Sequence, residues 1–442
     1  MPPTRESSKP ILLQRDAPPL AAALAGVVLS LVLSSGAAFA ASAPTPSVPA
    51  GFTITKIAAP APASSSNCDD LAFLEGHLFL GCQNKTLSVG GGGNSTLIEY
   101  TTAGTVLNTW SIKDKIDGMT ADPLNHRVIV SLNEDANTHL ATITPSAASG
   151  QQVTSYAYSP DPRGASTPSA LHTGGGTDQV SVDSAGHILI TASHAGTKTG
   201  TAVFKVVLTP PSSSTGTGTA TLSPTFLDNA TAANGNTGSG TVNLALGDVD
   251  SGAIVPQSSP RFGGSYVITD QTALEIVFAR NIFNGTGLTV LKTPFGLDDL
   301  LWATSNGGTL YVVDKGPTSV LPAVSASALY KVTGPFVKNT VLASNDGVGD
   351  QVVTVNLTNG NLTPFVQHLN TTKGLVYVDA SGSPTQLPLN GSTSSPTTSS
   401  STGSSSSADS SNTGLVVAIV VAALALLGCG AYWLARRGRT AS

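Results

Sequence analysis

The sequence predicts an all-β fold, a six-bladed β-propeller, and three observations lead to it. The chain of 442 residues holds 46 glycines and 28 prolines, a composition that suits many short strands joined by turns. Outside the two ends, no segment keeps the 3.6-residue apolar period of an amphipathic helix. One short template also recurs along the middle of the chain, which is typical of a repeat fold.

Each copy of the template has an acidic residue, apolar residues two and four positions later, a turn, and a strongly apolar strand. The alternation predicts a half-buried strand, and the Val/Ile/Leu-rich run predicts a more deeply buried one. The copies begin at Asp69, Asp117, Asp178, Asp248 or Asp250, and Asp299, and a half-copy runs from Lys373 to Asp379.

Two weaker strands follow each pair, for example residues 140–144 and 153–158. Four antiparallel strands in each repeat are typical of a propeller blade, and blades stack around an axis until the ring closes. Closure requires the strand at residues 52–57 to complete the blade that residues 373–379 begin. The alternative is a two-sheet sandwich of similar strand content, although a sandwich need not restart the same motif.

The template resembles the six-bladed propellers of the NHL-repeat and gluconolactonase-like families over about residues 52–390. The stretch from Val352 to Val366, followed by residues 373–378, is similar to the outer strands of one blade leading into the inner strand of the next. The resemblance implies a propeller fold. Gluconolactonase-like enzymes coordinate a divalent metal at the channel mouth and hydrolyse lactones or esters, but their ligand set is not recognisable on this chain, and such folds host unrelated functions.

The two ends of the chain predict a single-pass membrane protein whose middle faces outward. A basic segment, an apolar stretch and the tripeptide Ala38-Phe39-Ala40 are the parts of a secretory signal peptide; an uncleaved anchor is the alternative. The uncharged run from Gly414 to Ala435 can cross a bilayer at about 1.5 Å per residue. Three arginines after it keep that end in the cytoplasm. A buried core helix and a cleaved lipid-anchor signal are the alternatives for this run.

The predicted organisation has six parts. They are a signal peptide (1–40), a Pro/Ala tether (41–50), the propeller (51–390), a Ser/Thr-rich stalk (391–412), a transmembrane helix (413–435) and a basic cytoplasmic tail (436–442). A Ser/Thr/Gly-rich insert from Pro210 to Asn243 is expected to be a mobile surface loop.

The composition excludes a nucleic-acid partner and is compatible with glycosylation. Charged residues make up 11% of the chain and the net charge is −5, so there is no basic field to attract nucleic acid. Eight N-x-[ST] triplets are acceptors if the host modifies asparagine. They begin at Asn84, Asn94, Asn229, Asn284, Asn356, Asn361, Asn370 and Asn390.

Two of the three cysteines, Cys68 and Cys82, flank the first predicted strand pair; the third, Cys429, lies in the predicted membrane helix. A three-residue hairpin loop at residues 74–76, with Gly76 in the left-handed region, carries Cys68 opposite Cys82. Outside the reducing cytosol this pair is expected to form a disulfide. Two free thiols are the alternative.

The candidate site is acidic. Each template copy starts with an aspartate at the entrance of an innermost strand, and such positions can converge at one mouth of a central channel. The set is Asp69, Asp117, Asp178, Asp248 and Asp299, which could hold a hard cation such as Ca²⁺ through oxygen ligands. The alternative is that each carboxylate binds backbone N–H groups at its own strand entrance.

No catalytic motif accompanies these carboxylates. The sequence has no H-E-x-x-H, G-x-S-x-G or G-K-[ST] motif. His77, His126 and His187 repeat at one position just after a turn, so they belong to the template and are expected to be structural or solvent-facing. We therefore expect a membrane-anchored binding module for an extracellular ligand or protein, without a catalytic residue. A membrane-tethered, metal-dependent lactonase or esterase is the alternative.

Overall fold

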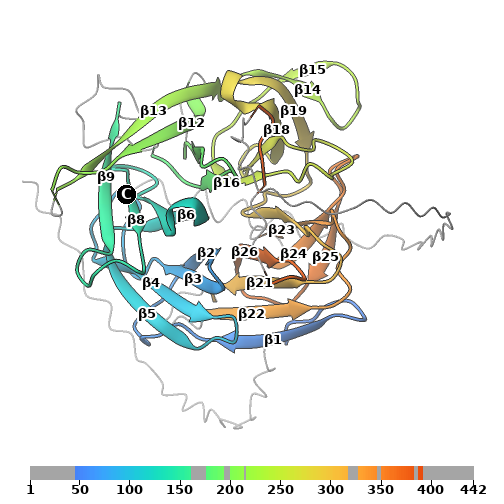
Figure 1. The fold of residues 1–442 in the computed structure, drawn as a ribbon. Helices are drawn as coiled ribbons and strands as arrows, with labels where there is room; N and C mark the ends of the chain where they lie inside the picture. The colour runs from blue at the N-terminus through green and yellow to red at the C-terminus, as the bar shows by residue number, and fades with distance from the viewer. Residues whose placement is uncertain are drawn as a thin grey trace, which may run out of the picture. The chain divides into compact units, whose positions relative to one another are not determined.

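The structure is a computed structural model that describes residues 45–160, 176–193, 200–213, 216–316, 327–345, 350–382 and 387–391. These residues form an all-β fold in which four-stranded groups surround a common centre (Figure 1). Within them, the only helical turns are two short 3₁₀ helices, η1 (Pro123–Asn125) and η2 (Ile282–Asn284). We call the six groups blades 1 to 6.

Blades 1 to 4 are each built from four consecutive antiparallel strands. Blade 1 has β2 (Cys68–Leu74), β3 (His77–Cys82), β4 (Asn94–Thr101) and β5 (Val106–Lys113). Blade 2 has β6 (Ile116–Asp122), β7 (Arg127–Leu132), β8 (His139–Ile143) and β9 (Val153–Ser159). Blade 3 has β10 (Val180–Val182), β11 (Ile188–Thr191), β12 (Thr201–Thr209) and β13 (Gly218–Leu227). Blade 4 has β16 (Val249–Ile254), β17 (Tyr266–Asp270), β18 (Glu275–Asn281) and β19 (Thr286–Lys292).

Blades 5 and 6 are interleaved in the sequence. Blade 5 has β20 (Leu300–Trp302), β23 (Val341–Asn345), β24 (Gln351–Val355) and β25 (Leu362–Val366), from the inside outward. Blade 6 has β26 (Thr372–Val378), β21 (Thr309–Asp314), β22 (Ala328–Thr333) and β1 (Thr53–Ala58). The chain thus begins blade 5, crosses to blade 6 for two strands, returns to complete blade 5, and then adds the inner strand of blade 6.

This interleaving corrects one predicted strand pair. The template after Asp299 predicts that residues 300–302 pair with residues 309–313. Instead, β20 pairs with β23, and β21 pairs with β22 and β26. Apolar periodicity shows that a strand is buried but not which strand is its neighbour, so the sequence pattern could not exclude the exchange. The predicted closure is confirmed, because β1 and β26 belong to one sheet.

The ring closes through its innermost strands and its core. Each of β2, β6, β10, β16, β20 and β26 contacts the inner strand of the next blade, and β26 returns to β2. Six hydrophobic clusters each lie between two adjacent blades. Between blades 1 and 2, for example, Phe79 and Trp110 pack in one cluster with Met119 and Val130. Each blade is therefore covered on both faces by its neighbours, which is a propeller and excludes the sandwich.

The segment from residue 210 to 243 differs from its predicted loop. Residues 218–227 form β13, whose buried residues alternate with exposed ones, and β13 pairs in parallel with β9 of blade 2. Downstream, β14 (Thr231–Asn234) and β15 (Thr241–Asn243) form a hairpin in which β14 pairs with β19. The Ser/Thr/Gly composition hid this alternation, although threonine suits a strand. The described part of the insert is therefore an extension of the blade rims.

Cys68 and Cys82 form the expected disulfide, although the hairpin that joins them differs from the prediction. The turn has two residues, Glu75 and Gly76, both with positive φ (52° and 88°), so Leu74 pairs with His77. Such a turn suits a tight hairpin. A bulge between Cys68 and Leu71 then shifts the register by one residue and brings the two cysteines opposite each other.

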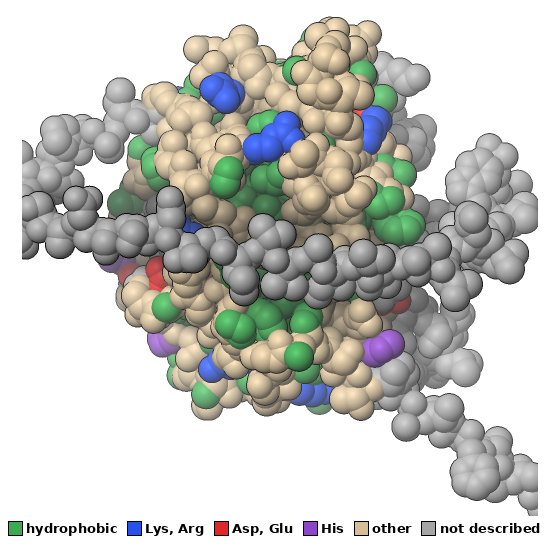
Figure 2. Space-filling model, turned by 90° about the vertical axis from the view of Figure 1, so that its right-hand side faces the viewer, with side chains coloured by type: hydrophobic (Ala, Val, Ile, Leu, Met, Phe, Trp, Pro, Cys, Tyr) green, Lys and Arg blue, Asp and Glu red, His purple; other side chains and the backbone are tan. Residues whose placement is uncertain are grey.

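The predicted signal peptide, the transmembrane run and nearly all of the stalk lie outside the described residues. Within the residues that the structure describes, no helix has the length and apolar character needed to span a membrane. The last described segment, 387–391, returns to the propeller, where Leu389 is buried in the cluster between blades 3 and 4. The face drawn in Figure 2 is mostly uncharged, with scattered Lys and Arg side chains and few carboxylates.

Candidate binding site in the central channel

A β-bulge at the entrance of several inner strands turns polar side chains toward the axis. In β2, Asp69 and Asp70 lie opposite the single residue Gly81. In β6, the residues after Ile116 are bulged in the same way, and in β26 the same irregularity falls at Lys373. A bulge places two residues against one and redirects the side chain of the extra residue. The same local device therefore recurs in blades 1, 2 and 6.

Hydroxyl groups on the second strand support the same backbone shape in three blades. The N–H of Gly118 donates to Ser131 Oγ at 2.7 Å. In blade 3, the N–H of Gln179 donates to Thr191 Oγ1 at 2.9 Å. In blade 5, the N–H of Asp299 donates to Ser344 Oγ at 2.7 Å. In each case, the residue before the N–H donor is an aspartate. The arrangement identifies equivalent positions more reliably than the sequence template does.

Six side chains, one per blade, form a ring at this end of the channel, which we call the channel ring. Its members are Asp69, Asp117, Asp178, Asp250, Asp298 and Lys373, in the order of blades 1 to 6. Three of the five predicted aspartates belong to it. In blades 4 and 5, Asp250 and Asp298 take the places that the sequence assigned to Asp248 and Asp299.

The two replaced aspartates differ in their contacts. Asp299 accepts hydrogen bonds from the backbone N–H of Leu300 and of Leu375, both at 2.7 Å, so it joins the inner strands of blades 5 and 6. Asp248 uses its own N–H to donate to the Asp270 carboxylate at 2.9 Å. Asp299 therefore fills the strand-entrance role that the sequence left open as an alternative to cation binding.

The channel ring is continuous. Lys373 Nζ lies 2.8 Å from Asp298 and 4.0 Å from Asp69. The Gln83 amide donates to both Asp69 and Asp117, which bridges blades 1 and 2. Oxygens of Asp117 and Asp178 come within 4.8 Å. The charge of Asp250 acts on Asp178, and the charge of Asp298 acts on Asp250.

Lysines neutralise one side of this ring. Lys315 Nζ lies 3.0 Å from Asp69, and Lys115 Nζ lies 2.9 Å from Asp117 and 2.6 Å from Glu134. Burial by itself would raise the pKa of Asp69, but the lysine charges outweigh burial and lower that pKa to about 2. Burial would lower the pKa of Lys115, but its carboxylate neighbours raise it above its ordinary value. Asp69 and Lys115 are therefore charged at neutral pH.

Carboxyls are in excess on the other side of the ring. Burial raises the pKa values of Asp178 and Asp250 well above the ordinary value, and neighbouring carboxylates raise them further. Both side chains therefore favour the protonated form more than an ordinary aspartate does. Burial also raises the pKa of Asp117, and the positive charge of Lys115 only partly offsets this shift. The sequence template missed Glu134, Lys115 and Lys315, since none of them stands at a repeated position. Lys373 opens the half-copy of the template but was not assigned to the site.

Asp70, the second bulge residue of blade 1, is the least compensated of these groups. Its Oδ2 is buried and has no hydrogen-bond partner among the described residues. Burial raises the pKa of Asp70 well above its ordinary value, and the strongest charges on it are the carboxylates of Asp299, Asp69, Asp298 and Asp117. Because these residues belong to blades 1, 2 and 5, Asp70 lies near the axis. The paired aspartates in the sequence were the only signal for it.

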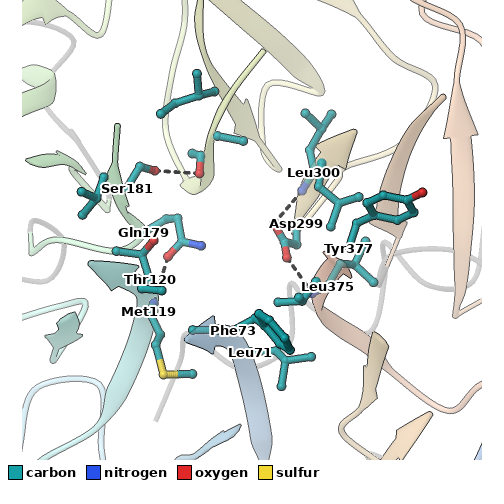
Figure 3. A pocket seen from close by; sticks show the side chains of 18 of the residues that line it. Leu71, Phe73, Met119, Thr120, Gln179, Ser181, Asp299, Leu300, Leu375 and Tyr377 are labelled. Atoms are coloured by element: carbon teal, nitrogen blue, oxygen red, sulfur yellow. Dashed lines mark hydrogen bonds between the residues drawn. The ribbon is translucent and has the colours of Figure 1, made fainter. Parts of the chain in front are cut away.

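A cavity of about 230 Å³ lies further along the same inner strands. Side chains from several blades surround it, with Gln179 and Ser181 on one side and Asp299, Leu375 and Tyr377 on the other (Figure 3). The side-chain oxygen Oε1 of Gln179 accepts a hydrogen bond from the backbone N–H of Met119 at 3.0 Å. Figure 3 shows the Gln179 amide nitrogen turned toward the cavity. The channel therefore changes from acidic at the ring to a mixed lining of polar and apolar side chains beyond it.

The three repeated histidines have local partners away from the channel ring. His77 Nδ1 lies 2.6 Å from Glu99, His126 pairs with Glu75 at the hairpin tip, and His187 Nδ1 lies 2.9 Å from Asp183. His126 is exposed. These contacts agree with the structural or solvent-facing roles expected from their repetition.

Comparisons with known proteins find similar folds and no family. No family model and no curated protein matches the chain. Among solved structures, a protein provisionally assigned as a gluconolactonase is 11% identical, covers 74% of this chain and 85% of its own, and has a TM-score of 0.38. A Bacteroides caccae protein of unknown function is 11% identical, covers 70% of this chain and 86% of its own, and has a TM-score of 0.38. A chain of a nidogen/laminin complex is 9% identical, covers 70% of this chain and 83% of its own, and has a TM-score of 0.37. The propeller-type fold of this chain is established by its own sheet topology.

Proposed function

We propose that this chain is a binding module, a propeller displayed on the outer side of a membrane by its stalk and C-terminal helix, with its site at the channel ring. The observation that carries the proposal is the meeting of Asp117, Glu134 and Asp178, which bring one carboxyl oxygen each within 4.8 Å of one another. Carboxylate oxygens are the ligands that hard cations prefer. A divalent cation such as Ca²⁺ is therefore the first ligand to test, and an extracellular molecule or protein would bind through it.

The local charges support a cation at this position. The side chain of Asp117 is 7% exposed, and its Oδ2 has no hydrogen-bond partner among the described residues. A buried carboxylate oxygen without a partner is costly. Lys115 already neutralises part of the charge of Asp117 and Glu134, so a bound cation would share these carboxylates with an ammonium group. Because burial raises the pKa of Asp178, cation binding would also favour release of a proton from this carboxyl.

Calorimetric titration of the full chain with CaCl₂ tests this proposal. Repeating the titration in two buffers of different ionisation heat measures the protons released. We expect saturable binding, proton release near pH 7, and weaker binding as the pH falls. Asp178→Asn should weaken binding at least about tenfold, whereas Glu75→Gln, which removes an exposed carboxylate at a hairpin tip, should leave it unchanged. Failure of Ca²⁺, Mg²⁺ and Zn²⁺ to bind would reject the cation site.

The outward placement needs its own test. External protease applied to intact cells should digest the propeller segment, since the proposed orientation leaves only a short tail inside. Persistence of the propeller under conditions that cleave a known surface protein would refute the placement and leave the cation site standing.

A metal-dependent hydrolase of lactones or esters is the second candidate. The observation that favours it is the Asp178–Asp250 pair, because a buried carboxyl with a raised pKa can act as a general acid or base. A panel of lactones and esters, with Ca²⁺ or Zn²⁺ added, distinguishes the two functions. Metal-dependent turnover that Asp178→Ala abolishes would establish the hydrolase. Absence of turnover with saturating metal would leave the binding function.

A further inference from the structure

The channel ring already accommodates primary ammonium groups. Lys115, Lys315 and Lys373 extend into it from blades 2 and 6, and each Nζ lies within 3.0 Å of a carboxylate oxygen. Their side chains are only 13% to 21% exposed. The carboxyl oxygens are thus spaced to receive ammonium groups at the end of short aliphatic stems.

Carboxyls nevertheless outnumber these ammonium groups. Three lysines face at least seven carboxyls: Asp69, Asp70, Asp117, Glu134, Asp178, Asp250 and Asp298. Asp70 is the carboxyl at which the surplus is greatest, because its Oδ2 is buried without a partner and its strongest neighbours are also carboxylates. One further positive charge near the axis would relieve that repulsion.

The cavity that can accept an apolar group begins one residue further along β2 from Asp70. Leu71 follows Asp70 directly and lines the cavity, and Asp299, whose charge acts on Asp70, lines it as well. Much of the remaining lining is apolar, with Phe73, Met119, Leu300 and Leu375 among its side chains. An apolar protein cavity of about 150 Å³ is large enough to bind benzene. The cavity of about 230 Å³ therefore has room for a ring or a short alkyl chain.

We propose that the channel binds a primary amine carrying a small apolar group, with the ammonium at Asp70 and the apolar group in the cavity. This inference rests on the proposed role of the channel as a binding site, but it does not require the divalent cation. An ammonium group donates up to three hydrogen bonds, so it can contact Asp70 and a ring carboxylate together. The Gln179 amide and the apolar walls would select against a second charge at the other end of the ligand.

Three ligands with the same phenyl tail test the proposal: 2-phenylethylamine, 2-phenylethanol and 3-phenylpropionate. Calorimetry of the full chain, with and without Ca²⁺, measures the affinity for each. We expect the amine to bind at least about tenfold more tightly than the alcohol, since hydrogen bonds to charged groups are the stronger ones. The carboxylate should not bind.

Two substitutions at Asp70 locate the ammonium. Asp70→Asn should reduce amine affinity at least about tenfold, while Asp70→Glu should retain most of it. Glu75→Gln is the matched control for loss of one carboxylate and should leave amine affinity unchanged. Circular dichroism confirms that each variant is folded. Equal affinity for amine and alcohol, or amine binding that Asp70→Asn leaves unchanged, would overturn the proposal. Ca²⁺ binding without amine binding would overturn this inference and leave the proposed function in place.

Discussion

Asp69→Asn is the substitution for which the structure predicts the clearest effect on stability. The Asp69 side chain is 15% exposed and lies 3.0 Å from Lys315 and 4.0 Å from Lys373. Asparagine has nearly the same shape but no charge, so it leaves the Lys315 ammonium group without its carboxylate. Lys373 keeps Asp298 as a partner. The substitution should therefore weaken the junction of blades 6 and 1.

The size of the effect follows from the pKa of Asp69. Its pKa falls from an ordinary 3.8 to about 2 in the folded protein, and each pH unit corresponds to about 1.4 kcal/mol. The lowered pKa therefore stabilises the folded state by about 2.4 kcal/mol at pH 7. Because the folded pKa is the lower one, this stabilisation is complete above 3.8 and is lost as the pH falls through 2. At pH 3 about 1.3 kcal/mol should remain.

Urea unfolding at pH 7 and pH 3, with the disulfide intact, measures this difference. Asp69→Asn should lower the free energy of unfolding by about 2.4 kcal/mol at pH 7 and by roughly half as much at pH 3. Glu75→Gln should change stability little at either pH, because its carboxylate is 55% exposed. The reasoning is refuted if Asp69→Asn costs nothing at pH 7, or if its cost is the same at both values.

Three further substitutions test other parts of the fold. Asp70→Asn should stabilise the protein at pH 7 and have no effect near pH 3. The reason is that the raised pKa of Asp70 makes the wild type lose stability as the pH rises above 3.8. Urea unfolding measures this effect, and a variant that is less stable than the wild type at pH 7 would contradict the prediction. Replacing Cys68 and Cys82 together by serine should lower stability by about 3 kcal/mol for a loop of about 15 residues, and an unchanged urea midpoint would show that the loop is held by other contacts. Gly118→Ala should lower the melting temperature by an amount equivalent to about 1–3 kcal/mol. The reason is that a Cβ at residue 118 would lie 2.3 Å from the backbone carbonyl oxygen of Asp178. A variant that melts at the same temperature as the wild type would mean that β6 and β10 can move apart without loss of stability.

The local strand pattern of this propeller can be predicted from the sequence because each inner strand repeats the same burial requirement. The template after Asp69, Asp117 and Asp178 locates β2, β6 and β10 together with their hairpin partners. The closing strand β1 was also predicted, because blade 6 otherwise lacks an outer strand. The exchange between blades 5 and 6 was not predictable, because β20 finds its partner about forty residues further along the chain. Burial periodicity carries no information on that choice.

The disulfide shows how a correct result can rest on an incorrect local geometry. A three-residue loop without a bulge and a two-residue loop with a bulge both place Cys68 opposite Cys82. The difference matters for the site, since the bulge in β2 is what brings both Asp69 and Asp70 to the channel. Sequence alternation assumes regular strands, so an extra residue in one strand escapes it.

The sequence by itself determined that acidic residues stand where the inner strands begin, because those residues recur in one template. Only the tertiary structure decided which of them meet, since in blades 4 and 5 a shift of one or two residues substitutes Asp250 for Asp248 and Asp298 for Asp299. It also decided their charge. Lys115 and Lys315, which lie outside the template, and Lys373, at the start of the half-copy, neutralise one side of the ring, while Asp70, Asp178 and Asp250 remain in excess. A pKa depends on burial and on neighbours distant in the chain, and both exist only once the ring has closed.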